Sequence, residues 1–429
     1  MIRLLFSFYA ICCTSVLYGQ NPTRSLPYYI ETARNNSPLI RDYHNQIAIQ
    51  QNELQRLKAF YTRSRVELNG DYLFVPIIVR EDGKTSFKWN AKDATDYYGY
   101  DLGESSGSLH AGINWTQPLL GNKIYKTAKE QAQVNTDILN DNIRMEKHQL
   151  ERSVKEQYIL CLLDKQQIDL ADSITETLNR QRSIVQKMIQ SGSVRQSDLH
   201  LLTIEQAAND ELRIAALQSY HTHLMDLNIL CGIKDTAKVD LEHIDLQPDL
   251  SSDMPSSFWE RYRLDSLNTV ASLNTFHSQY KPQLNLFVNG GLQIGEFAYA
   301  YKHFGWSAGL TFSWTLFDGK QKRWKERQTR VQLNTIETYK VNFQNQNHLR
   351  IQQYLTEIQR YDKRKALLRK QSAEYEALLA DYRKEIQAGQ LSVIDYITVL
   401  KSKIQVEKNY LLLQTNRQLL VAAFNYWNW

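Results

Sequence analysis

Two long spans of this sequence lack both glycine and proline. They are the 70 residues between Gly121 and Gly192 and the 69 residues between Gly319 and Gly389. Because glycine and proline are the residues that interrupt helices, nothing in either span prevents a continuous helix. Each helix would be roughly 105 Å long, and its apolar stripe would need partner helices to cover it. We therefore expect long antiparallel coiled coils in which the chain reverses near Gly192 and Gly389.

The spans belong to an internal tandem repeat. A Trp-Thr dipeptide precedes each span, at Trp115 and at Trp314, and an aspartate follows each terminal glycine by six residues, at Asp198 and at Asp395. Such self-similarity determines the architecture. We expect a first repeat over residues 20–233, with strands at about 65–117, a long helix at about 121–191 and a return helix at 193–231. An irregular equatorial segment at 234–256 precedes a second repeat over 257–429, with strands at about 283–317, a long helix at about 319–388 and a return helix at 390–426.

The segments before each long helix alternate apolar and polar residues with a period of two, which is typical of strands with one apolar face. Val66 and Leu68 alternate with Glu67 and Asn69, and Leu310 and Phe312 lie in a similar pattern. This alternation suits a soluble sandwich as well as a membrane barrel. Strands of about ten residues with aromatic residues near their ends favour the barrel. Since about eight strands are needed to close a barrel and each chain supplies four, several chains must share it.

The first residues have the composition of a signal peptide. Arg3 precedes a charge-free stretch from Leu4 to Tyr18, and cleavage is expected near Gly19. A membrane-anchor helix and lipid attachment at Cys12 or Cys13 are the alternatives. We therefore expect an exported protein with a signal peptide over residues 1–19.

Composition and motifs argue against several classes of function. A formal net charge of +5 over 429 residues is no signature of nucleic-acid binding. The sequence has no phosphate-binding loop, no serine elbow and no cluster of metal-ligating residues, so we expect neither an enzyme nor a metal or cofactor site. Cys161 and Cys231 lie beyond the signal peptide and allow at most one disulfide.

These motifs resemble those of the TolC-like outer-membrane efflux proteins over nearly the whole chain beyond the leader. The similar segments are Arg34–Leu39, Gln117–Gly121, Leu316–Gly319 and the two glycine-to-aspartate tips. The resemblance implies a homotrimer that combines a transmembrane β-barrel shared between three chains with an α-helical coiled-coil barrel in the periplasm. It also implies an outer-membrane channel of a tripartite efflux or type I secretion system, which contacts outer-membrane lipid, docks on a periplasmic adaptor protein and depends indirectly on an inner-membrane pump.

The resemblance also carries over to individual residues. The tip turns that would meet the adaptor are Gly192, Ser193 and Val194 in the first repeat and Gly389, Gln390 and Leu391 in the second. An ordinary helix-reversing loop is the alternative. Asp395 is similar to the aspartate that rings the periplasmic mouth of these channels, although Thr398 stands where a second acid often follows. Asp395 is alternatively a solvated helix acid, and Asp198 is expected on an outer face or as a helix-capping residue.

Several alternatives stay open at the level of sequence. A basic cluster around Trp324 could contact anionic lipid, line the tunnel or form a solvated helix face. The whole chain could instead be a barrel-anchored structural or adhesive coiled coil without transport, or a soluble periplasmic scaffold. The sequence identifies no cargo, because a wall of mixed polar residues carries little chemical signature.

Overall fold

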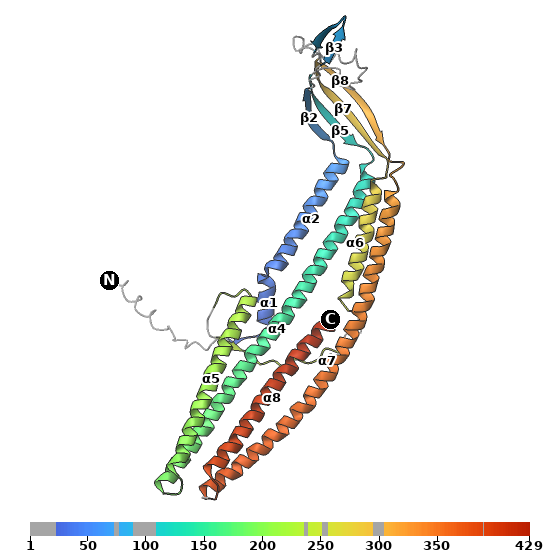
Figure 1. Cartoon of the computed structure of the whole chain (residues 1–429). Helices are drawn as coiled ribbons and strands as arrows, with labels where there is room; N and C mark the ends of the chain where they lie inside the picture. Colours follow the sequence, from blue (N-terminus) through green and yellow to red (C-terminus); the bar gives the residue numbers. More distant parts are fainter. Residues whose placement is uncertain are drawn as a thin grey trace, which may run out of the picture. The chain divides into compact units, whose positions relative to one another are not determined.

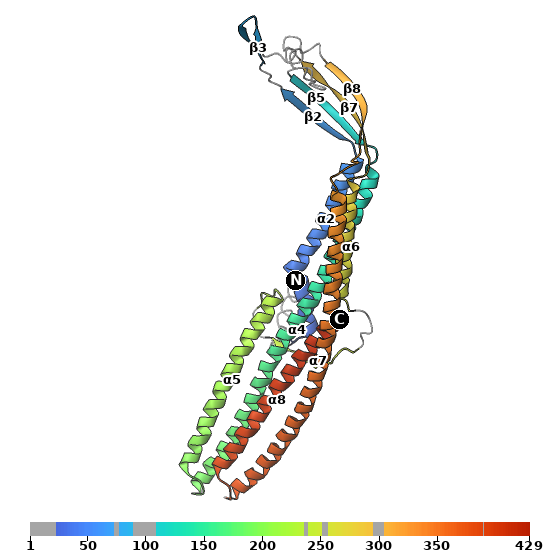
Figure 2. The ribbon, with the colours of Figure 1, turned by 45° about the vertical axis from the view of Figure 1, so that its right-hand side comes forward.

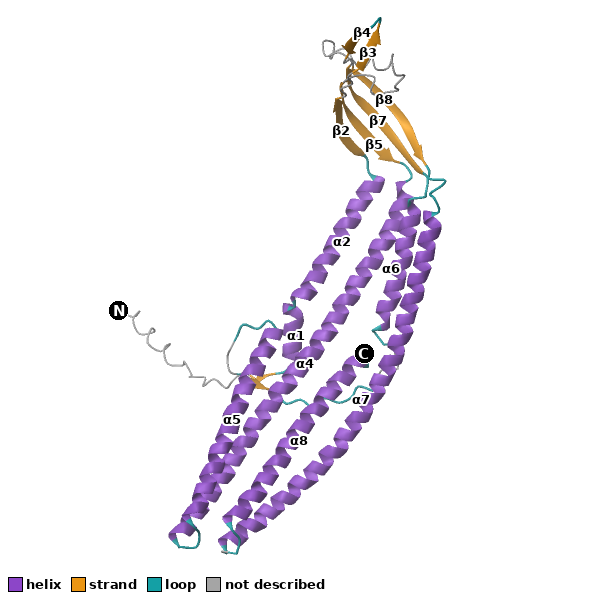
Figure 3. Cartoon of the chain, in the orientation of Figure 1, coloured by secondary structure: helices purple, strands orange, loops and turns teal. Residues whose placement is uncertain are grey.

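The computed structural model describes residues 23–72, 77–88, 109–235, 239–250, 256–294, 304–388 and 390–429. The predicted signal peptide and Gly389 lie outside these ranges. Most of the described chain is helical (Figure 3). The chain forms two compact units, the first made of residues up to Asp42, Ile143–Phe258 and Val341–Trp429, the second of Tyr43–Asn142 and Trp259–Lys340. Each unit takes residues from both repeats, because the packing is lateral between helices.

Two helical hairpins (Figure 1) supply most of the first unit, which takes their long helices only from Ile143 and from Val341 onward. Helix α4 covers Gly121–Gln190 and α5 covers Gln196–Leu230. Helix α7 covers Gln321–Gln387 and α8 covers Val393–Trp427. Both return helices begin three residues later than the sequence predicts, because the turn and the N-cap residue occupy the intervening positions.

The N-terminal part of the chain contains two short helices, α1 (Leu26–Asn36) and α2 (Pro38–Thr62). Ser37 separates them, and its Oγ accepts a hydrogen bond of 3.3 Å from the backbone N–H of Ile40. Proline is favoured at the first helical position because it has no N–H to leave unpaired. Helix α1 was not among the elements predicted from the sequence.

A core around Tyr29 and Tyr158 holds α1, α4 and α5 together in the first unit. Both tyrosines are fully buried, and Cys161 and Cys231 lie in the same cluster. The Tyr158 hydroxyl donates to the carbonyl of Glu242 at 2.7 Å. Strand β1 (Thr23–Arg24) pairs in parallel with β6 (Asp240–Leu241), so the predicted irregular segment contains a short strand.

Residues 246–249 of that equatorial segment are bound to α8 by amide side chains. The backbone N–H of Asp249 donates to Asn425 Oδ1 at 2.8 Å, and Asn425 Nδ2 donates to the carbonyl of Gln247 at 3.0 Å. Gln418 Oε1 accepts from the backbone N–H of Leu246 at 2.7 Å. These side chains satisfy backbone groups that a non-helical segment cannot pair within itself.

The second unit combines helices with an antiparallel sheet. Helix α6 covers Trp259–Ser278, and Asn268 on it accepts a 2.6 Å hydrogen bond from Gln131 of α4. The four-stranded sheet has the order β2-β5-β7-β8. Its strands are β2 (Arg65–Tyr72), β5 (Leu109–Pro118), β7 (Gln283–Ile294) and β8 (Phe304–Ser313).

A separate hairpin, which the sequence analysis did not identify, lies within the first predicted strand region. Strand β3 (Ile77–Glu81) pairs with β4 (Lys84–Lys88). Asp82 and Gly83 form the turn, and both have positive φ, 48° and 72°. An Asp-Gly pair between short strands is the usual signal of a tight hairpin, so the sequence did contain the information.

Candidate functional site

The first helical tip is a tight turn centred on Gly192. Gly192 has φ +74°, and a Cβ there would meet nothing within 4 Å, so glycine is needed for its backbone conformation. Its N–H donates to the carbonyl of Ile189 at 3.0 Å, and the N–H of Ser193 donates to Met188 at 2.9 Å. Ser193 is exposed, whereas the half-buried Val194 packs against the core of the tip. The predicted docking residues therefore point in different directions.

The second tip has the same arrangement on both sides of Gly389. The N–H of Ala388 donates to the carbonyl of Lys384 at 3.0 Å, and the N–H of Gln390 donates to Glu385 at 2.9 Å. Gln390 is exposed, and Leu391 packs against the core of the tip as Val194 does. Among the predicted docking residues, each tip thus presents one polar side chain to solvent and packs the next one against the interior.

A single apolar core joins the two tips, which lie side by side in Figures 1 and 2. Its buried members come from all four helices of the hairpins: Ile174, Leu178, Val185, Leu202, Leu379, Ile386, Val393, Tyr396, Ile397 and Leu400. Burying side chains of this size contributes roughly 1.5–3 kcal/mol each, so any separation of the tips must overcome a large apolar contact. This shared core was not predicted from the sequence, because periodicity indicates an apolar stripe on a helix but not which helix covers it.

The aspartates that follow the two tips occupy equivalent helical positions but make different contacts. Asp198 Oδ2 accepts a 3.3 Å hydrogen bond from the backbone N–H of Arg195, so Asp198 caps α5. At Asp395 the cap is Ser392, whose Oγ accepts from the Asp395 N–H at 3.3 Å. The Asp395 side chain is exposed, and its carboxylate forms no ion pair within the described part of the chain. Its position is compatible with the predicted constriction, which stays a prediction.

The sheet of the second unit has one apolar and one polar face. Val66 lies opposite Trp115, and Leu68 lies opposite Ile113, so these apolar residues share a face. The same face continues across β7 and β8 through Val288, Ala308, Leu286 and Leu310. Leu68 is 82% exposed and Trp306 is 77% exposed. Such a contiguous exposed apolar surface marks an interaction site in the intact protein.

The polar face and the two sheet edges add further constraints. Asn114 and Asn289 lie opposite each other on the other face. Edge strands β2 and β8 each have one side that pairs with no strand among the described residues. An unpaired edge is a template for pairing with another chain. The sheet therefore has the features of a fragment of a larger one.

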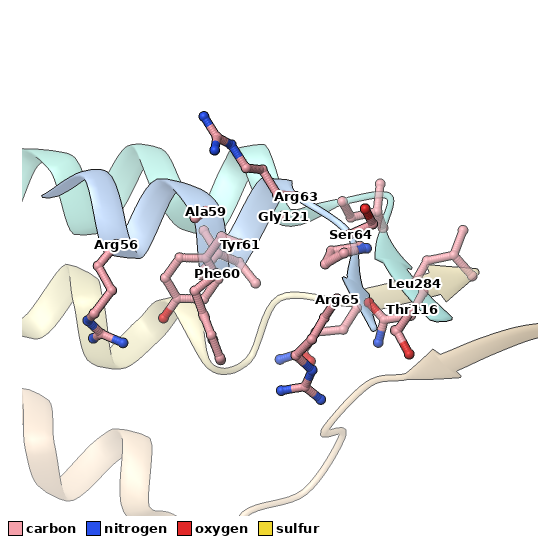
Figure 4. A pocket seen from close by; sticks show the side chains of 15 residues that line it. Arg56, Ala59, Phe60, Tyr61, Arg63, Ser64, Arg65, Thr116, Gly121 and Leu284 are labelled. Atoms are coloured by element: carbon pink, nitrogen blue, oxygen red, sulfur yellow. The ribbon is translucent and has the colours of Figure 1, made fainter. Parts of the chain in front are cut away.

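A cavity of about 690 Å³ lies where the strands of the second unit meet its helices. Figure 4 shows Arg56 and Arg65 pointing to one side of it and Arg63 pointing away from them. Arg56 is 2.7 Å from Glu53, and Arg65 is 3.2 Å from Glu67. Two of the three arginines that line the cavity therefore have a carboxylate partner.

The described ranges also contain cysteine, histidine and aspartate side chains outside the tips and the sheet. No group of three or more His, Cys, Asp or Glu residues there could hold a metal ion. Cys161 and Cys231 are free and buried, and burial raises the pKa of the Cys231 thiol to about 12. His223 Nδ1 is 2.5 Å from Asp164 Oδ2, and burial raises the pKa of Asp164. None of the described helices is both long and apolar enough to cross a membrane.

The paired helical hairpins and the two-faced sheet define a class of fold that outer-membrane proteins of known structure share. No protein-family model matches the sequence, and a comparison with curated proteins finds no match. Solved structures do match. CusC aligns with 13% identity over 96% of this chain and 95% of that chain, with a TM-score of 0.69. The outer membrane protein VceC from Vibrio cholerae aligns with 13% identity over 94% of this chain and 96% of that chain, with a TM-score of 0.70.

The open state of the MtrE outer membrane channel from Neisseria gonorrhoeae is a third similar structure. It has 14% identity over 94% of this chain and 88% of that chain, with a TM-score of 0.65. At such identities the similarity concerns the fold. The resemblance indicated by the sequence motifs is thereby confirmed at the level of the fold.

Proposed function

We propose that the chain is the outer-membrane channel of a tripartite efflux or type I secretion system, a passive trimeric conduit from the periplasm to the exterior. The observation that carries the proposal is the sheet, which has an exposed apolar face and two unpaired edges. Four strands cannot close a barrel, but three copies would supply twelve and pair β8 of each copy with β2 of the next. The apolar face would then contact lipid, and the polar face would line the lumen.

The helical hairpins would form the periplasmic tunnel. Their exposed tip residues, Ser193 and Gln390, suit contact with an adaptor protein. In this proposal the adaptor couples the conduit to an inner-membrane pump that drives transport. Asp395, repeated three times around an axis, would place like charges at the mouth and attract cations.

Conductance of the purified protein in planar lipid bilayers tests the channel. A barrel-anchored adhesive protein would show no stepwise current, and a periplasmic scaffold would stay in the soluble fraction of a cell lysate. Either result would reject the proposal.

The constriction is tested with Asp395→Asn, which should lower cation selectivity and weaken block by divalent cations. Asp198→Asn is the matched control, because it removes the same charge from the equivalent position of the other hairpin, where the carboxylate caps a helix. Equal currents from both variants and the wild type would place the constriction elsewhere.

Adaptor docking is tested by site-directed cross-linking from Ser193→Cys and Gln390→Cys. Both positions are exposed, so cross-links to the adaptor are expected from each. Thr222 is exposed near the opposite end of α5 from the first tip and serves as the position for a control cysteine. Cross-links that form only at the control position would contradict docking at the tips.

A further inference from the structure

The first turns of α7 carry an unusual density of exposed cations. Six basic residues lie within eleven positions, namely Lys320, Lys322, Arg323, Lys325, Arg327 and Arg330. Glu326 is the one acid in this range, and its Oε1 lies 3.3 Å from His277 Nε2. None of the six cations forms an ion pair with another residue that the structure describes. The surface therefore carries uncompensated positive charge.

This charge does not stabilise the helix that carries it. The N-terminus of a helix is its positive end, so cations in the first turn are unfavourable there. Asp318 offsets part of the penalty, because its two carboxylate oxygens accept hydrogen bonds of 2.8 Å from the backbone N–H groups of Lys320 and Lys322. An anionic partner bound to this surface would offset the remainder.

Exposed apolar side chains lie directly beside the cations. In the linker between β8 and α7, Leu316 is 78% exposed and Phe317 is 79% exposed. Trp324 is also exposed, and the Arg327 guanidinium lies 5.0 Å from the centre of its ring. Trp324 and Arg327 are three residues apart on α7 and so share one face of the helix, which Lys320 immediately precedes. The surface is thus amphipathic rather than purely basic.

The order of these groups along the chain matches the order of groups in a lipid leaflet. The apolar face of β8 comes first and ends in Phe312, the exposed aromatic linker follows, and the cations come last. Aromatic rings favour the membrane interface, and lysine and arginine bind phosphate-bearing headgroups beyond it. A soluble anion would explain the cations but not the adjacent exposed rings.

We propose that the linker at residues 314–318 and the first turns of α7 form a binding surface for glycerophospholipids with anionic headgroups. The acyl chains contact Phe312, Leu316 and Phe317, and the headgroup phosphate accepts hydrogen bonds from Arg323 and its basic neighbours. This inference rests on the proposed function, because it requires the sheet to lie in a membrane. It names the lipid class and the residues that select it.

The test measures lipid binding to the purified, delipidated full-length protein by native mass spectrometry. Dioleoyl phosphatidylglycerol and dioleoyl phosphatidylcholine are compared, since they share acyl chains and differ in headgroup charge. The test variant is K322Q/R323Q/R330Q. The matched control is K363Q/R369Q/K370Q, which removes three exposed cations from the middle of the same helix.

The wild type and the control variant should prefer phosphatidylglycerol. The test variant should lose on the order of tenfold to a hundredfold in affinity for that lipid with little change for phosphatidylcholine. Equal loss in both triple variants, or no headgroup preference in the wild type, would overturn the inference. Dissociation of the oligomer in the test variant with unchanged lipid preference would also overturn it, because the cations would then contact a second copy.

Bilayer conductance is recorded on the same preparations to separate this inference from the proposed function. Currents in the wild type without a lipid preference would reject the lipid surface alone. Absence of current in the wild type would reject the channel itself.

Discussion

Lys401 Nζ lies 2.7 Å from Glu205 Oε1, and this ion pair connects α8 of one helical hairpin to α5 of the other. The Lys401 side chain is 60% exposed and that of Glu205 is 20% exposed, so solvent screens the interaction. Pairs of this kind contribute about 0.2–1 kcal/mol. The ion pair and the apolar core of the tips both stabilise the arrangement in which the two tips are in contact.

In the proposed channel, opening requires the two hairpin tips to separate. Lys401→Gln removes an ion pair that holds them together, so it should raise the channel's open probability in planar bilayers by at most about fivefold, which corresponds to about 1 kcal/mol. Lys384→Gln is the control, because Lys384 pairs with Asp381 within α7 and bridges no hairpins. The effect should diminish at high salt. An equal rise in the control variant would assign the change to net charge instead of the bridge.

His148 makes the stability of the first unit depend on pH. Its ring stacks on those of Tyr426 and Trp429, with centroids 4.6 Å and 3.9 Å away, and its Nε2 donates to the carbonyl of Tyr426 at 2.9 Å. Burial lowers the pKa of His148 below its ordinary value of 6.5. The unfolded chain then binds a proton more readily than the folded one, so stability is full above pH 6.5 and decreases as the pH falls below it.

Thermal unfolding between pH 7.5 and pH 5 measures this dependence. His148→Phe keeps an aromatic ring in the stack and removes the titrating group, so its unfolding temperature should fall less with pH than that of the wild type. Identical pH profiles for both proteins would show that other groups dominate.

Gly121 starts α4 at a point where no side chain fits. A Cβ at this position would lie 1.6 Å from the carbonyl oxygen of Tyr61. Gly121→Ala must displace α2 from α4 and should reduce the free energy of unfolding by at least about 2 kcal/mol. Gly290→Ala is the control, because its Cβ would make an ordinary contact of 3.8 Å with Trp306. Thermal unfolding in detergent compares the two variants. Similar losses of unfolding temperature in Gly121→Ala and Gly290→Ala would contradict the close approach of Gly121 to the Tyr61 carbonyl oxygen.

The two cysteines should behave as inert thiols. Cys161 and Cys231 are fully buried, and burial raises the pKa of both, so little reactive thiolate forms at neutral pH. A maleimide should label both thiols slowly in the folded protein and both of them readily in denaturant. As a control, the cysteine of the Ser191→Cys variant, at the exposed first tip, should react quickly in the folded protein. Absence of labelling under non-reducing denaturing conditions would instead indicate a disulfide.

Much of the backbone could be predicted because its causes are local. Absence of glycine and proline allows α4 and α7, positive φ at Gly192 follows from the need to reverse the chain, and alternation assigns Val66 and Leu68 to one face. The short helix α1 and the β3–β4 hairpin were missed although their signals are also local, since Pro27 begins one and Asp82-Gly83 forms the other. Asp198 was expected on an outer face or as a helix-capping residue, and its carboxylate does accept from the backbone N–H of Arg195. The role of Asp395 stays a prediction, because its spacing from the tip glycine is the same and its exposed side chain makes no contact, among the residues that the structure describes, that would identify the role.

The sequence by itself determined where the helices run, where they reverse and which side of each strand is apolar, because these properties depend on residues a few positions apart. Only the tertiary structure decided which surfaces meet. Lys401 and Glu205 are 196 residues apart, and His148 and Tyr426 are 278 apart. An apolar or charged stripe fits many partners equally well, so the choice among them is made by the packing of the whole chain.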